Sequence, residues 1–111
     1  MASDGNLGLL QGTLDVLILK TLTWGERHGY AVARWIRETT RDELQVDDGA
    51  LYTALHRMED RGWLAARWGA NDDGRRVKLY SLTAAGRREL RARTDQWTRY
   101  ANAVFRVLRT A

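Results

Sequence analysis

The segment from Asp48 to Gly62, DGALYTALHRMEDRG, is predicted to be a helix with two chemically different faces. At about 100° per residue its apolar side chains fall on one stripe, which consists of Leu51, Ala54, Leu55 and Met58. The opposite side carries groups that hydrogen-bond or stack, none of them acidic: Tyr52, Thr53, His56 and Arg57. One face is therefore expected to lie in a core, while the other displays groups suited to nucleic-acid bases and phosphates. Taken alone, the pattern also fits an ordinary amphipathic surface helix.

The ends of this helix carry their own markers. A carboxylate at Asp47 or Asp48 can cap the first turn, and Gly62 tolerates the left-handed conformation that ends many helices. The segment is therefore predicted to start and stop within its own sequence.

A β-hairpin is predicted directly after this helix. The runs WLAARWG and RRVKLYSL alternate and are rich in β-branched and aromatic residues, and Asp73-Gly74 between them indicates a turn. A hairpin in this place is the wing of a winged helix-turn-helix. Its predicted DNA contacts are the basic residues at or near the tip: Arg75, Arg76 and Lys78. Because Asp72 and Asp73 would weaken such contacts, we expect the wing to position the protein on DNA more than to read its sequence.

Residues 7–23 and 29–40 are predicted to be two further helices. In the first, one apolar stripe consists of Leu10, Leu14, Leu17, Ile18 and Leu22, and a second side carries Leu9, Val16 and Leu19. A helix that is apolar on two sides is normally buried on two sides, so we expect the second side to meet another subunit.

The helix over residues 29–40 has an apolar and a basic face. Val32, Ala33, Ile36 and Thr40 are expected to point inward, and the opposite face carries Arg34, Arg37 and Arg41. Two interpretations of the basic face remain open, a solvated surface and a set of phosphate contacts.

From Thr83, which is a suitable N-cap residue, the chain is predicted to be helical to its end, because it contains no proline and only Gly86 interrupts the pattern. Spacings of four and three residues form a heptad seam, made of Leu90, Thr94, Trp97, Ala101, Val104 and Leu108. At about 1.5 Å per residue such a helix spans about 39 Å, which the rest of the chain is too small to cover. We therefore expect a homodimer. The predicted interface consists of Leu10, Leu14, Leu90, Trp97, Ala101, Val104, Phe105 and Leu108.

The charge of the chain favours a polyanionic partner. The formal net charge is +4, and all but two of the 18 basic residues are arginines. Arginine suits bidentate contacts to phosphate and guanine better than lysine does. An arginine-rich proteome would explain part of this count.

Several functional classes are excluded by what 111 residues do not contain. There is no cysteine, the two histidines lie far apart, and no catalytic triad motif or glycine-rich phosphate loop is present. We expect no enzymatic activity, no cofactor and no metal site. The sequence also shows no membrane-length apolar run and no signal peptide at its start, so we expect a cytoplasmic protein.

Five segments of the chain, in this order and spacing, resemble the PadR-like transcriptional regulators. They are LLQGTLDVLILKTL, HGYAVARWI, GALYTALHRMEDRGWL, WGANDDGRR and KLYSLTAAGRREL, and the likeness extends from Leu10 to about Leu108. The family often has serine or threonine where Ala50 stands and proline where Thr53 stands. Only one helix is predicted after the wing, as in the short-tailed branch of the family.

The resemblance implies a repressor that is a homodimer joined by its first and last helices, with two recognition helices in successive major grooves. It also implies an apolar channel for planar aromatic effectors, with Trp97 at the position of a bordering tryptophan and Leu9, Gly12 and Val16 as its neighbours. Simple packing of Trp97 in the heptad seam remains the alternative.

We therefore predict a mainly α fold with a small β-hairpin. Residues 1–82 would form a winged helix-turn-helix DNA-binding domain and residues 83–111 a C-terminal dimerisation helix. The expected partners are an operator in double-stranded DNA, a second copy of the chain and a planar aromatic ligand. The competing hypothesis is a winged-helix module that docks another protein and does not read DNA. A docking face of that kind would be more apolar and less basic than the one around His56.

Overall fold

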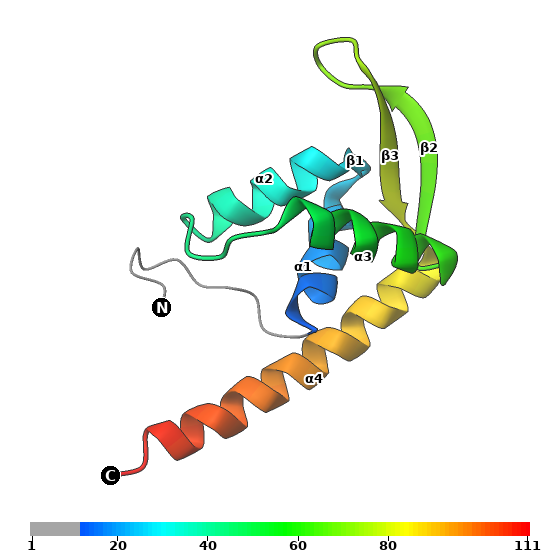
Figure 1. The fold of residues 1–111 in the computed structure, drawn as a ribbon. Coiled ribbons are helices and arrows are strands. Elements are labelled where there is room, and N and C mark those ends of the chain that lie inside the picture. Colours follow the sequence, from blue (N-terminus) through cyan, green and yellow to red (C-terminus); the bar gives the residue numbers. More distant parts are fainter. Residues whose placement is uncertain (1–11) are drawn as a thin grey trace.

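The computed structural model describes residues 12–111 and contains the four predicted helices and the predicted hairpin of that range, with one added strand (Figure 1). Its helices are α1 (Thr13–Thr21), α2 (Gly29–Thr39), α3 (Asp48–Asp60) and α4 (Ala84–Leu108). A short 3-10 helix, η1 (Leu22–Trp24), follows α1. The strands are β1 (Arg27–His28), β2 (Leu64–Ala70) and β3 (Arg76–Leu82). The predictions for Leu9 and Leu10 lie outside the described residues.

Strand β1 is the addition, and it turns the predicted hairpin into a three-stranded antiparallel sheet. The strand order is β1-β3-β2, with Arg27 opposite Tyr80 and His28 opposite Leu79. Two residues are too few to show the alternation by which a strand is predicted. The long β2–β3 hairpin extends beyond the helices as the wing (Figure 1).

The core lies between the first three helices and the base of the sheet. The predicted apolar stripe of α3 is buried throughout, as are Val32, Ala33 and Ile36 of α2. From α1 the core receives Ile18 and Leu19, with Leu22 following in η1. The prediction that Leu19 lies on a second, intersubunit side was wrong, because Leu19 is fully buried within one chain. Helix α1 contacts α2, α3 and α4, so neighbours within the chain enclose a wider arc of it than one stripe.

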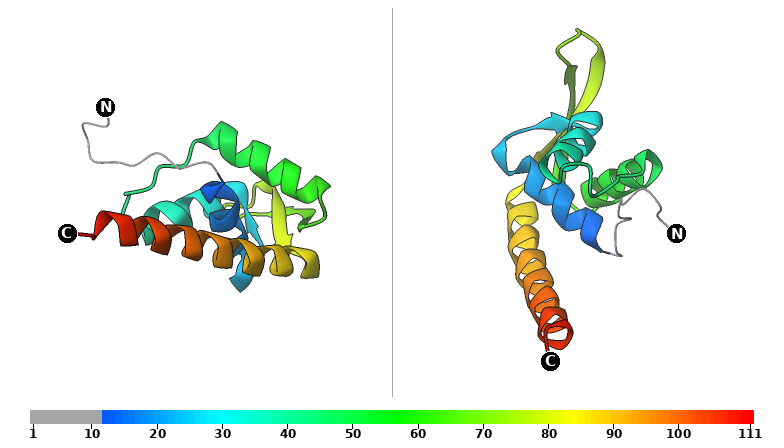
Figure 2. Two further views of the ribbon diagram at one scale, coloured as in Figure 1. Left: turned by 90° about the horizontal axis from the view of Figure 1, so that it is seen from below. Right: turned by 90° about the vertical axis from the view of Figure 1, so that its left-hand side faces the viewer.

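Helix α4 begins against the turn that follows α3. The Thr83 hydroxyl caps the helix by accepting a hydrogen bond from the Gly86 amide (3.0 Å), and it also donates to the Gly62 carbonyl (2.7 Å). A Cβ atom at Gly86 would lie 2.1 Å from the Trp63 carbonyl oxygen, so glycine permits this close approach. Beyond its contacts with α1, helix α4 runs away from the body of the molecule (Figure 2).

These elements confirm the predicted fold class, a mainly helical winged helix-turn-helix with a long C-terminal helix. Among residues 12–111, no helix combines the length and apolar character needed to cross a membrane.

Candidate nucleic-acid interface

The exposed face of α3 is the first part of the candidate interface. The Asp47 carboxylate caps the helix by accepting a hydrogen bond from the Ala50 amide (2.9 Å), as one of the two predicted caps. Because the opposite stripe is anchored in the core, Tyr52, Thr53 and His56 are exposed. These three polar side chains therefore form one accessible surface, which we call the reading face.

Tyr52 also connects the reading face with the start of α2. A Cβ atom at Gly29 would lie 2.7 Å from Cε1 of Tyr52, so the tyrosine ring rests directly over this glycine. The next residue along α2, Tyr30, is exposed, and the Arg34 guanidinium lies 5.8 Å from the centre of its ring. The structure thus places exposed Arg34 beside an aromatic side chain that sequence reasoning did not select.

Arg57 differs from the other predicted DNA contacts of α3, because its guanidinium is hydrogen-bonded to another side chain of the same protein. Its Nη1 and Nη2 atoms donate hydrogen bonds to Oδ2 and Oδ1 of Asp15 at 2.8 and 2.7 Å. The hydrogen bonds to Asp15 raise the pKa of Arg57, an effect that partial burial opposes. Helical spacing placed Arg57 beside Thr53, but its long side chain turns back toward α1. Sequence reasoning missed Asp15, a lone acidic residue in an apolar helix.

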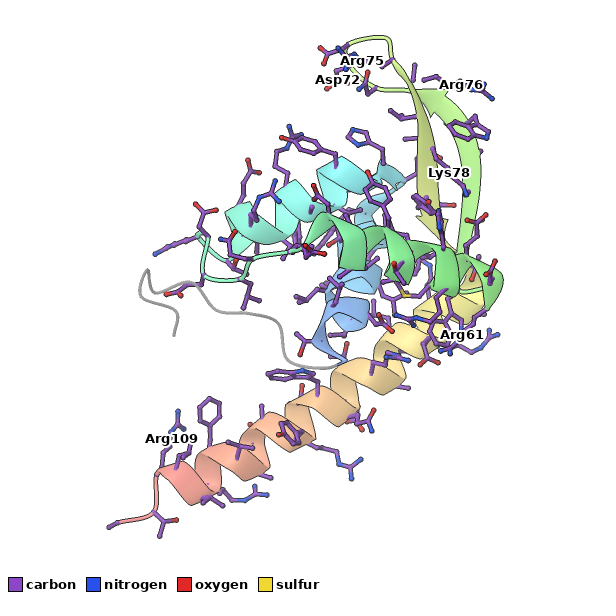
Figure 3. The ribbon with its side chains drawn as sticks, viewed as in Figure 1. Arg61, Asp72, Arg75, Arg76, Lys78 and Arg109 are labelled. Atoms are coloured by element: carbon purple, nitrogen blue, oxygen red, sulfur yellow. The ribbon has the colours of Figure 1, made fainter. Side chains whose placement is uncertain are left out.

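The wing presents two of its three predicted cations to solvent. Arg75 is exposed in the turn (Figure 3). In this turn the Asn71 side-chain oxygen accepts hydrogen bonds from the amides of Asp73 and Arg75. Exposed Arg76 lies with its guanidinium 4.5 Å from the ring centre of Trp68. Asp72 is exposed in the same turn, as expected from the sequence.

Lys78, the third predicted wing contact, connects the wing to α3. Its Nζ atom lies 3.0 Å from Oε1 of Glu59 and 5.5 Å from the ring centre of Tyr80. The hydrogen bond to Glu59 raises the pKa of Lys78. The ion pair holds the wing against the C-terminal half of the helix that carries the reading face.

A second candidate site is an open cavity of about 500 Å³ between the start of α1 and the middle of α4. It is lined by Gly12, Thr13, Val16, Arg93, Gln96, Trp97 and Tyr100. The Trp97 indole nitrogen donates a hydrogen bond to the Thr13 hydroxyl (3.2 Å). The structure therefore brings Trp97, Gly12 and Val16 together, while Leu9 lies outside the described residues.

The predicted interface residues differ in how far the chain itself covers them. Leu14 and Leu90 are half-buried and pack against the core, and Ala101 is also half-buried. The exposed large apolar side chains of α4 all lie at or after Trp97: Trp97, Tyr100, Val104, Phe105, Val107 and Leu108. Within residues 12–111 the first half of α4 thus packs Leu90 against the core, while the second half leaves its large apolar side chains exposed.

Comparison with known proteins assigns this architecture to a family. Residues 18–92 match the family model described as the transcriptional regulator PadR-like family. An uncharacterised protein of Lysinibacillus sphaericus is 28% identical over 89 residues, which cover 80% of this chain and 82% of that protein.

Solved structures agree in fold. A PadR family transcription regulator from hypervirulent Clostridium difficile R20291 is 29% identical, with a TM-score of 0.75 over 87% of this chain and 99% of that one. A PadR family transcriptional regulator from Eggerthella lenta DSM 2243 is also 29% identical, with a TM-score of 0.76, and the match covers 91% of this chain and 86% of that one. A transcriptional regulator from Clostridium thermocellum, at 24% identity, matches the fold with a TM-score of 0.79, and the match covers 86% of this chain and 90% of that one. The chain belongs to the PadR-like family and is a DNA-binding winged-helix transcriptional regulator, not an enzyme.

Proposed function

We propose that this regulator is a cytoplasmic repressor that binds a pseudo-palindromic operator as a homodimer. The observation that carries the proposal is the second half of α4, where Val104 and Leu108 of the heptad seam are exposed and Tyr100 and Phe105 beside the seam add apolar surface. Contiguous apolar surface of this kind marks an interaction site, and a seam on one long helix fits a second copy of the same helix. A two-fold dimer would present two reading faces to one side of a duplex.

The contacts to DNA follow from the exposed side chains. Tyr52 and His56 supply base-edge or stacking contacts, and Thr53 supplies a lesser one. Arg75 and Arg76 on the wing and Arg34 on α2 contact phosphates, which positions the protein without reading sequence. The other two predicted contacts, Arg57 and Lys78, are paired with Asp15 and Glu59, and we assign them no DNA contact in this proposal.

Selection of bound duplexes from a random pool tests the assignment. We expect inverted half-sites about 10 bp apart, because recognition helices related by a two-fold axis must meet the same face of the groove. His56→Ala should weaken binding to the selected duplex by about 1 to 3 kcal/mol and reduce the base preference at one position in each half-site. Binding to no duplex at all would instead favour a protein-docking module.

A charge comparison separates wing contacts from general electrostatics. Arg75→Ala should weaken all duplexes alike and lower the salt slope of binding by about one unit, because one phosphate is no longer neutralised. Arg109→Ala is the matched control, because Arg109 lies at the opposite end of the molecule from the wing (Figure 3). Equal effects of the two substitutions would contradict a wing contact.

We further propose that the cavity beside Trp97 takes a planar aromatic effector that releases the operator. The support is the aromatic and apolar lining from Val16, Trp97 and Tyr100. A ligand changes DNA affinity only through its different affinities for two dimer shapes, and typical couplings weaken binding about 5- to 150-fold. Planar aromatic compounds should quench the fluorescence of the wild type. Calorimetric binding of the same compounds that Trp97→Ala abolishes and Trp97→Phe retains would support the site. Binding without loss of operator affinity would show that the ligand does not regulate DNA binding.

A repressor is distinguished from an activator by transcription in vitro. From a promoter that contains the selected operator, added protein should lower transcript yield, and the aromatic effector should restore it. A rise in transcript yield on adding protein would contradict repression and leave the DNA contacts in place.

A further inference from the structure

We propose that Asp15 is a positioning residue of the DNA interface. By holding Arg57 of α3 and Arg93 of α4 at once, it sets the direction of the recognition helix relative to the dimerisation helix. In a dimer, that direction determines which half-site spacing the two reading faces accept. The inference rests on the proposed homodimer and assigns Arg57 a structural role in place of a DNA contact.

One carboxylate joins three helices. The side chain of Asp15, on α1, is only 10% exposed, and it accepts two hydrogen bonds from Arg57 at 2.8 and 2.7 Å. Nη1 of Arg93 lies 3.4 Å from Oδ2 of the same carboxylate. Arg93 is in turn bound through its Nε atom to Glu89 at 2.6 Å. The two cations and two carboxylates balance in charge, so the partly buried cluster holds no unpaired ion.

A second attachment lies farther along α3, at its C-terminal end. The Thr83 hydroxyl lies 2.7 and 3.0 Å from the carbonyl oxygens of Gly62 and Trp63, and Gly86 packs closely on the Trp63 carbonyl. The Arg93 guanidinium also lies 5.0 Å from the centre of the Trp63 ring. This end of α3 is thereby joined to the first turns of α4.

Two separated attachments define a direction, whereas one would permit a pivot. Arg57 lies within α3, whereas Gly62 and Trp63 lie just beyond its last residue, Asp60, so the two attachments hold different points of the α3 segment. The Arg57–Asp15 contact is a bidentate fork, which restricts orientation as well as distance. On the other side of α3, the Glu59–Lys78 pair leads to the wing and not to α4. The Asp15 cluster is therefore the link that makes the angle of α3 depend on α4.

Two substitutions at Arg57 test the role by separating charge from geometry. Arg57→Lys keeps the charge that a phosphate contact needs but loses the bidentate fork. Arg57→Gln removes the charge as well, and it leaves Asp15 paired with Arg93, so the cluster keeps a cation. Both variants should remain folded by circular dichroism. Affinities are measured for the duplex that the wild type selects and for duplexes whose half-sites are moved by 2 bp, which rotates them by about 70°.

We expect both substitutions to lower the preference for the selected spacing by about tenfold, with no change in the salt slope. Asp15→Asn should have the same effect. Arg88→Gln, an equal loss of charge at an exposed position of α4 without an ion pair in the part of the chain that is described, should keep the wild-type preference.

Two outcomes would overturn the inference. If Arg57→Gln lowers the salt slope by about one unit while Arg57→Lys does not, and the spacing preference is intact in both, then Arg57 contacts a phosphate. If all variants keep the wild-type preference and slope, the cluster is only structural. A wild-type protein that tolerates any spacing would instead contradict the homodimer, and this inference with it.

Discussion

The two halves of α4 are one continuous helix, yet they are held by different means. Its first half is capped by Thr83, packs on the Trp63 carbonyl through Gly86 and reaches Asp15 through Arg93. Its second half projects from the body, with Tyr100 62% and Leu108 71% exposed (Figure 2). The first half is therefore part of the chain's own fold, while the second has apolar surface with no cover in residues 12–111.

This difference shows that helix formation and helix burial are separate questions. A run without proline and with suitable side chains forms a helix along its whole length. Most of the stability of a helix in a protein nevertheless comes from packing of its apolar face. Residues 12–111 do not supply that packing for the second half of α4, and in the proposed homodimer the partner's helix would supply it. Substitutions in the two halves should therefore have different consequences.

The largest effect is expected in the second half. Val104→Asp would place an unpaired carboxylate in the proposed intersubunit seam, at an expected cost of about 3 to 5 kcal/mol. The dissociation constant of the dimer should therefore rise by at least about a hundredfold. Light scattering and sedimentation across a concentration series measure this change. Asn102→Asp, outside the seam of the same half, is the control and should leave the dimer intact. A wild-type protein that is monomeric at micromolar concentration would contradict the proposed interface outright.

A smaller effect is expected at the junction of α4 with the body. Replacing glycine by alanine normally favours a helix by about 0.5 to 1 kcal/mol. At Gly86, however, the added Cβ would lie 2.1 Å from a backbone oxygen. We expect Gly86→Ala to be destabilising by about 1 to 3 kcal/mol in denaturant unfolding, because the start of α4 must move away from the Trp63 carbonyl to make room for the methyl group. Gly49→Ala, whose Cβ meets only an Asp47 side-chain atom at 3.2 Å, should be nearly neutral.

The cap of α4 should contribute less. Thr83→Ala removes the acceptor for the Gly86 amide and the donor to the Gly62 carbonyl, and we expect a loss of about 1 to 2 kcal/mol in unfolding free energy. Thr83→Ser retains the hydroxyl and should recover most of that loss. If alanine and serine behave alike, the methyl group and not the cap is responsible.

The smallest effect is expected where the two halves meet. Trp97→Phe removes one hydrogen bond, to the Thr13 hydroxyl, but retains an aromatic ring in the cavity wall. The unfolding free energy should fall by about 0.5 to 1.5 kcal/mol, measured at a fixed protein concentration because dimerisation contributes to stability. A large drop in dimer affinity would instead assign Trp97 to the seam, the alternative raised by its heptad spacing.

Periodicity and capping chemistry were sufficient to predict most of the architecture. The buried stripe of α3, the caps at Asp47 and Thr83 and the turn at Gly74 all follow from rules that act over a few residues. Strand β1 was not predictable in this way, because its two residues are extended only through pairing with β3.

What the tertiary structure alone decided is where long charged side chains bind. Helical spacing placed Arg57 with Tyr52 and His56, and the predicted hairpin placed Lys78 with Arg75 and Arg76. The partners Asp15 and Glu59 are 42 and 19 residues away in the sequence, so no local pattern indicated them. An arginine or lysine side chain is long and flexible, and its charged group goes to whichever acceptor packing brings within reach. The sequence by itself therefore determined the helices and their faces, and the packing of α1, α3 and α4 determined which cations remain free to meet DNA.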